Sequence, residues 1–131
     1  MPIFESHAHY LDSRFDPDRD ALLQSLAAAG VERVMEVACA PEDFLPALAL
    51  ADQYPFLYAA LGVHPHDASQ WDPQVAAQLA RLLSQHPKAK ALGEIGLDYH
   101  YDLSPRPVQR QAFQEQLELA RQLDKPVILH V

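Results

Sequence analysis

The sequence predicts an α/β fold built from parallel β/α units, and two observations favour that class. Apolar segments that suit strands alternate strictly with segments of helical periodicity along the 131 residues. Several strand segments are apolar at consecutive positions, which is typical of strands that are buried on both faces of a parallel sheet. We therefore expect about five strands and four helices, joined by right-handed connections.

The expected strands are short apolar runs, and the last of them closes the chain. Between them lie longer segments whose apolar residues recur at helical spacing. The expected strands are IFESHAH (3–9), VERVMEVAC (31–39), FLYAALGV (56–63), KALGEIGL (90–97) and PVILHV (126–131), and the expected helices span 16–30, 41–53, 72–85 and 104–123.

Residues that favour helix ends punctuate the helical segments. We expect Asp16 to cap the first helix, Pro17 to lie in its first turn and Gly30 to follow its end. Pro46 is expected to distort the second helix, and Ser104 to cap the fourth. The third helix opens on Asp-Pro, and the fourth carries its apolar stripe at Val108, Ala112, Phe113, Leu117 and Ala120.

Composition and charge are those of a globular protein without a basic face. The net charge is −8 with histidines neutral, so any polyphosphate partner would need bound cations to supply the attraction. Cys39 is the only cysteine, which excludes an internal disulfide and suggests a packed thiol at a strand end. No apolar run is long enough to cross a membrane, and the N-terminus lacks a signal-peptide pattern, so we expect a cytoplasmic protein.

Histidines and carboxylates collect where the expected strands end. His7 and His9 are two residues apart, so both imidazoles leave one face of an extended segment. In (β/α) barrels the active site forms at this end of the strands, and such side chains suit a divalent metal such as zinc or manganese. The strand-end residues are His7, His9, His64, His66, Glu94, Asp98 and His130.

Each of these residues also has an interpretation without metal. Glu94 could form a salt bridge, and Asp98 could orient a histidine or cap a turn. The histidines could be polar strand ends, loop residues or substrate contacts, and we expect His86 and His100 to be exposed. The joint placement of these residues at the ends of separate strands favours the metal site.

Four motifs resemble the TatD-related metal-dependent deoxyribonuclease family, a branch of the amidohydrolase-like metal-dependent hydrolases. They are SHAH, GVHPHD, GEIGLDYHYDLSPRPVQ and KPVILH, in family order along the whole chain. The resemblance implies a (β/α)8 TIM-type barrel with two divalent ions, of zinc, magnesium or manganese. It assigns His7 and His9 to one metal, His130 to the other, and Glu94 to both. His64, His66, Asp98 and Arg106 would contact substrate or support the ligands, with Arg106 binding phosphate or ordering its loop.

The activity that the resemblance implies is hydrolysis of phosphodiester bonds, with DNA as the substrate and no membrane or stable protein partner. One alternative is another amidohydrolase-like activity, on an amide, lactone or phosphotriester. Glu94 argues against it, because several such relatives use a modified lysine at that place. The other alternative is a non-catalytic fragment that binds metal.

Two features of this chain depart from the family pattern. Glu5 stands where the family usually has aspartate, and the chain ends at Val131, before the family's strand-six histidine and its strand-eight aspartate, the expected general base. A complete barrel needs about 250 residues. We therefore expect 1–131 to be the N-terminal portion of a single hydrolase domain. The barrel would not be closed, and the chain would be inactive alone and able to self-associate through the edge of 126–131.

Overall fold

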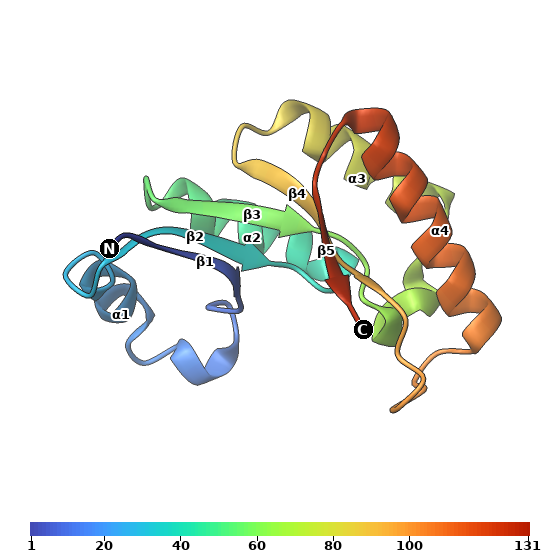
Figure 1. Ribbon diagram of the computed structural model, residues 1–131, viewed down its shortest axis with the longest axis horizontal. Helices are drawn as coiled ribbons and strands as arrows, with labels where there is room; N and C mark the ends of the chain where they lie inside the picture. The colour runs from blue at the N-terminus through green and yellow to red at the C-terminus, as the bar shows by residue number, and fades with distance from the viewer.

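A single curved sheet of five parallel strands organises the molecule, which a computed structural model describes over residues 1–131 (Figure 1). The strands lie in chain order, and each pairs in parallel with the next. The predicted α/β class is confirmed, and the sheet is an open part of a barrel. Its strands are β1 (Ile3–Ala8), β2 (Val31–Val37), β3 (Leu57–Leu61), β4 (Ala89–Gly96) and β5 (Val127–His130).

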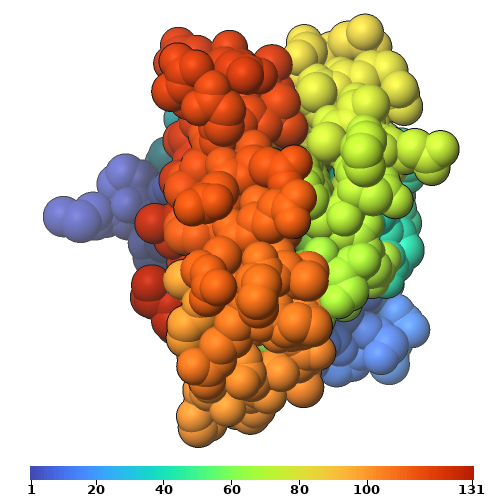
Figure 2. Space-filling view, turned by 90° about the vertical axis from the view of Figure 1, so that its right-hand side faces the viewer, coloured from blue at the N-terminus to red at the C-terminus, as the bar shows by residue number.

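Helices connect successive strands and pack on the sheet. The α-helices are α1 (Arg19–Ser25), α2 (Phe44–Asp52), α3 (Pro73–Gln85) and α4 (Arg106–Leu123), and the 3-10 helices are η1 (Ser13–Phe15), η2 (Pro41–Asp43) and η3 (Pro65–Gln70). α2 contacts β2 and β3, whereas α3 and α4 contact β4. Figure 2 shows α4, in orange and red, lying alongside α3 and η3.

Apolar side chains cover both faces of the central strands. Successive residues of a strand point to opposite faces, so Val34 and Met35 belong to two different clusters. The larger cluster lies between the sheet and the helices and includes the fully buried Phe44, Leu57 and Leu92. The smaller cluster comprises Met35, Val37, Ala60 and Ala91. This double burial agrees with the consecutive apolar residues of the predicted strands.

The first helix begins later than the sequence predicts. α1 starts at Arg19, so the expected cap at Asp16 and first-turn position of Pro17 are wrong. The Asp16 carboxylate instead accepts a hydrogen bond from the Arg19 guanidinium at 2.7 Å. α1 ends at Ser25, so the expected place of Gly30 directly after this helix is wrong. Gly30 instead has a φ of +91° just before β2, a conformation that residues with a Cβ rarely adopt.

The second and third helices agree better with their proline signals. The break in 41–53 lies before Phe44, so Pro46 falls in the first turn of α2, where a missing N–H leaves no hydrogen bond unmade. The change from the 3-10 turn of η2 to α2 lies two residues before Pro46, near the distortion that the sequence predicts. Asp72 caps α3 as the Asp-Pro pair predicts, because its carboxylate accepts the N–H of Val75.

The fourth helix differs from its prediction at its start and on its buried face. Its N-cap is Pro105, while the Ser104 hydroxyl donates to the carbonyl of His66 at 2.9 Å. Leu117, expected in the apolar stripe, is 37% exposed. The helix is therefore rotated from the predicted orientation, and its buried residues are Gln109, Ala112, Gln116 and Ala120.

Candidate metal centre

Two histidines leave the end of β1 close together. The ring centroids of His7 and His9 are 5.1 Å apart, and β1 shifts register against β2 between Glu5 and Ala8. The Nδ1 of His9 lies 3.0 Å from the carbonyl oxygen of Val37. A carbonyl can only accept, so Nδ1 carries the hydrogen and Nε2 keeps the lone pair that a metal ligand needs.

The Glu94 carboxylate links the two outer strands of the sheet. Its Oε1 lies 3.0 Å from Nε2 of His7, and its Oε2 lies 3.0 Å from Nδ1 of His130. Glu94 comes from β4 and is only 7% exposed. Side chains from β1, β4 and β5 therefore meet at one place although β1 and β5 are not paired.

Asp98 lies behind two of the histidines and holds their rings. Its Oδ2 is 3.1 Å from Nε2 of His130 and 2.6 Å from Nε2 of His66. Its Oδ1 accepts the backbone N–H groups of His100 and Tyr101. Hydrogen bonds to the charged form, above all from the Tyr101 N–H, lower the pKa of Asp98. An ionised, fixed carboxylate can orient both imidazoles.

His64 presents a hydrogen-bond donor to the same place. Its Nδ1 accepts the backbone N–H of His66 at 3.0 Å, so the ring hydrogen is on Nε2. That Nε2 lies 3.7 Å from Oε2 of Glu94. Burial, which disfavours the charged ring, lowers the pKa of His64 to about 4. A neutral His64 therefore offers an N–H toward the centre.

The donor atoms fit a divalent cation in kind and in spacing. One ligand atom each from His7, His9 and Glu94 lie within 4.8 Å of one another. Tetrahedral zinc with ligands at about 2.0 Å places those ligands roughly 3.3 Å apart, close to the 3.0 Å between His7 and Glu94. His64, His66 and His130 form a second group with the same spacing, but the Nδ1 lone pair of His64 accepts the His66 N–H, so His64 acts there as a hydrogen-bond donor and not as a ligand.

The surroundings of His130 give a second reason to expect a cation at this centre. Its two ring nitrogens face two carboxylates, Glu94 at 3.0 Å and Asp98 at 3.1 Å. A neutral imidazole has one N–H, and carboxylates only accept, so the neutral ring can donate to only one of the two. A cation held between His130 and Glu94 would satisfy the other contact. The residues therefore fit the metal that the sequence motifs imply.

Two buried glutamines of α4, which the sequence analysis missed, hold the backbone beside these side chains. Gln116 accepts the N–H of Val63 at 2.8 Å and donates to the carbonyl of the same residue at 3.2 Å. Gln109 makes the same pair of bonds with Asp98, at 2.8 and 3.1 Å. Their seven-residue spacing on one helix face is the signal that could have found them.

Glu36 was also missed, and it fixes the chain just after His9. Its side chain is 1% exposed and accepts the N–H groups of Tyr10 at 2.8 Å and Leu11 at 2.9 Å. Burial raises the pKa of Glu36, although these two hydrogen bonds oppose that shift. The position of Glu36 between the apolar residues Met35 and Val37 is the signal that could have found it.

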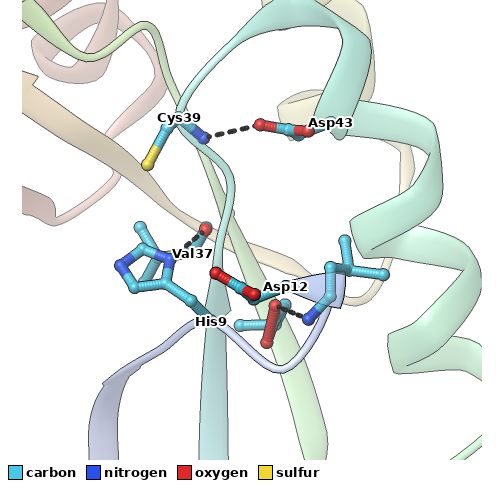
Figure 3. Close-up of a pocket in the computed structure, with 7 residues that line it drawn as sticks. His9, Asp12, Val37, Cys39 and Asp43 are labelled. Atoms are coloured by element: carbon cyan, nitrogen blue, oxygen red, sulfur yellow. Dashed lines mark hydrogen bonds between the residues drawn. The ribbon is translucent and has the colours of Figure 1, made fainter. Parts of the chain in front are cut away.

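A hollow of about 350 Å³ opens beside His9 (Figure 3). Asp12, Cys39 and Asp43 line it, and the Cys39 N–H donates to the Asp43 carboxylate at 3.4 Å. Burial raises the pKa of the Cys39 thiol to about 12, so the thiol stays protonated. Cys39 thus has no feature of a nucleophile.

Three residues that the sequence analysis singled out, Arg106, His100 and His86, belong to neither group of possible metal ligands. The Nε of Arg106 lies 3.2 Å from both carboxylate oxygens of Asp102, and its guanidinium stacks 4.2 Å from the ring centroid of Tyr99. These contacts order the loop before α4. His100 is exposed as expected, whereas His86 is half-buried and lies 3.3 Å from Asp52.

Comparison with known proteins identifies relatives along nearly the whole chain. The family model described as TatD related DNase matches residues 4–131. The chain is 36% identical over 128 residues to the uncharacterized metal-dependent hydrolase YabD of Bacillus subtilis, covering 98% of this chain and 50% of YabD. It is 40% identical over 128 residues to the 3'-5' ssDNA/RNA exonuclease TatD of Cronobacter turicensis, covering 98% and 48%.

Solved structures give the same fold. The crystal structure of YjjV, a TatD homologue from Escherichia coli, matches with a TM-score of 0.88 and 40% identity, covering 98% of this chain and 50% of that one. A TatD-family hydrolase from Entamoeba histolytica matches with a TM-score of 0.90 at 21% identity, which supports the fold alone. The chain spans about half the length of the relatives it matches. None of its helices combines the length and hydropathy that crossing a membrane requires.

Proposed function

The chain belongs to the TatD-related DNase family, and we propose that it forms part of a divalent-metal-dependent hydrolase that cleaves phosphodiester bonds in DNA. Relatives named metal-dependent hydrolase and 3'-5' ssDNA/RNA exonuclease support this reaction class. A cytoplasmic location and a nucleic-acid substrate are parts of the same proposal.

The observation that carries the proposal is the double contact of Glu94. One buried carboxylate faces His7 through Oε1 and His130 through Oε2, each at 3.0 Å. This arrangement suits a carboxylate shared by two cations, with His7 and His9 on one side and His130 on the other. Zinc, magnesium and manganese are the candidate ions, and imidazole ligands favour zinc among them.

Two cations at such a site would lower the pKa of a bound water and offset charge on the phosphate. The chain's own side chains have complementary tasks. Asp98 orients His130 through Nε2, and the Nε2–H of His64 faces the centre, where it can donate to a phosphate oxygen. His66 lines the same side, held by Asp98.

We also propose that residues 1–131 correspond to the N-terminal portion of a single TatD-like domain. The coverage of about half of each relative supports this correspondence. The family's further histidine and its aspartate, the expected base for the attacking water, would then come from the segment that corresponds to the relatives' other half. Residues 1–131 alone would bind metal but would not hydrolyse DNA.

The test combines metal titration with a nuclease assay of the purified chain, alone and mixed with the second half of Escherichia coli YjjV. We expect chelator-sensitive DNA hydrolysis only in the mixture, and Glu94→Gln should abolish it without unfolding the chain. Glu118→Gln, at an exposed carboxylate on α4, is the matched control. Unchanged metal affinity in Glu94→Gln would show that Glu94 is not a ligand. DNA turnover by the chain alone, lost in Glu94→Gln, would show that the ligand set is incomplete.

A further inference from the structure

Gly96 is the last residue of β4, at the point where that strand meets the end of β5. It pairs with His130 in the register of the two strands, and the N–H of Leu97 donates to the His130 carbonyl oxygen at 3.4 Å. The φ of Gly96 is +151°, a backbone conformation that residues with a Cβ rarely adopt. A side chain at position 96 is therefore disfavoured even before its neighbours are considered.

The backbone of His130 fills the space beside Gly96. A Cβ at position 96 would overlap the His130 carbonyl oxygen and lie 3.0 Å from the carbonyl carbon and 3.1 Å from the amide nitrogen. Backbone atoms cannot move aside by changing a rotamer, so one strand end would have to shift. Seven of the eight residues of β4 are buried, whereas β5 has no fully buried residue. We therefore expect β5, and His130 with it, to move.

Two carboxylates stand two residues before and two residues after Gly96. Oε2 of Glu94 lies 3.0 Å from Nδ1 of His130, and Oδ2 of Asp98 lies 3.1 Å from Nε2 of the same ring. Glu94 and Asp98 are only 7% and 6% exposed, so neither is free to follow a displaced ring. Because the carboxylates contact different sides of the ring, a shift of about 1 Å would take at least one contact outside the usual hydrogen-bond range.

We propose that Gly96 is a positioning residue for His130. The lack of a side chain at position 96 lets the end of β5 approach β4 until the His130 ring fits between Glu94 and Asp98. One consequence rests on the proposed function, namely that the ring so placed binds the second cation. A larger residue at position 96 should therefore weaken the cation site at His130 and leave the site at His7 and His9 in place.

The first measurement is zinc binding by the purified chain, followed by isothermal titration calorimetry. We expect the wild type to bind two ions. Gly96→Ala should raise the Kd of one of them about 10–100-fold, the range for changing a residue that orients a metal ligand. His130→Gln should weaken the same ion, so the double variant should bind zinc as His130→Gln does. His9→Gln should weaken the other ion.

Gly30→Ala is the matched control. Gly30 also has a positive φ, +91°, but a Cβ there would meet only the Met1 carbonyl oxygen, at 3.9 Å. The variant therefore introduces backbone strain without any contact to His130, and it should lower stability while leaving both zinc affinities unchanged. Equal loss of zinc affinity in the two glycine variants, or no loss in Gly96→Ala, would overturn the positioning role.

The second measurement needs no metal. In the metal-free chain with isotope-labelled histidine, NMR spectroscopy reports the ring nitrogens of His130, whose chemical shifts depend on the contacts with Glu94 and Asp98. Gly96→Ala should change these shifts, whereas Gly30→Ala should not. Changed shifts in a chain that binds no zinc would keep the positioning role and refute the proposed metal centre. Zinc binding with unchanged shifts would do the reverse.

If Gly96→Ala does not fold, the wild type decides. The amide signals of Gly96 and Leu97 should then move more when zinc binds at His130 than when it binds at His7 and His9. An equal or smaller response to the ion at His130 would overturn the positioning role.

Discussion

The central and outer strands of the sheet differ sharply in burial. Seven of the eight residues of β4 are buried, whereas five of the six residues of β1 are exposed and β5 has no fully buried residue. Yet the candidate centre draws on both regions, with Glu94 from β4 and the histidines from β1 and β5. The buried part of the sheet thus supplies the shared carboxylate, while the least covered strands supply its partners.

Removing a core side chain should produce the largest effect and measure the contrast directly. Leu92 is fully buried on β4, whereas Leu129 is 51% exposed on β5. We expect Leu92→Ala to lower the free energy of unfolding by about 3 kcal/mol, through lost burial and a cavity. Leu129→Ala should cost less than about 0.5 kcal/mol. Urea unfolding followed by circular dichroism measures both, and similar losses would contradict the contrast.

Bound metal should reduce the difference in stability between the outer strands and β4, because its candidate ligands come from both regions. If zinc binds only the folded chain, free metal at a hundred times its Kd should add about 2.7 kcal/mol of stability. Hydrogen exchange should then slow most in β1 and β5, because His7 and His130 come from those strands. Adding chelator should restore fast exchange there. Uniform slowing over all five strands would contradict this account.

Removal of Gln116, the α4 side chain that holds the backbone of Val63, should give the next largest loss of stability. Gln116→Leu removes the partner of the buried N–H of Val63, and an unsatisfied buried donor costs about 1–3 kcal/mol. We expect that loss in thermal or urea unfolding, accompanied by weaker metal binding, because Val63 precedes His64. Gln114→Leu, on the exposed face of the same helix, should change neither quantity. A neutral Gln116→Leu would show that α4 does not position the centre.

The smallest expected effect is the pH dependence of stability that the buried Glu36 of β2 causes. Because burial raises the pKa of Glu36, its contribution to stability is full below the ordinary glutamate pKa and is lost as pH rises through the folded value. The stability difference between wild type and Glu36→Gln should therefore shrink as pH rises. Glu118 should behave oppositely, because the hydrogen bond from Arg121 lowers its pKa and stability is lost as pH falls. Unfolding curves across the acidic range distinguish the two signs.

The strands were predictable because their signals are local and repeated. Consecutive apolar residues in 56–63 and 90–97 indicated burial on two faces, which β3 and β4 have. Helix starts were less predictable, because a capping side chain can find a better partner elsewhere. Asp16 binds Arg19, and Ser104 binds the His66 carbonyl, which lies far away in the sequence. The first competitor lies three residues away and the second 38, and a capping pattern by itself reports neither.

The convergence of His7, Glu94 and His130 followed from their placement at strand ends. Their role as ligands remains a prediction. Sequence reasoning missed Gln116 and Glu36, whose importance lies in backbone groups that only the folded chain brings to them. Side chains that touch a centre carry a compositional signal, whereas those that hold its backbone look like ordinary polar residues.

The strictly sequential strand order also bears on how the chain folds during synthesis. Every strand pairs with the strand that precedes it, so each β/α unit can dock as soon as it leaves the ribosome. Contacts between near neighbours form fast, because little loop entropy is lost. The contact between His7 and Glu94 spans 87 residues, and that between Glu94 and His130 needs the last strand. We therefore expect the scaffold to be assembled first and the candidate centre to close last.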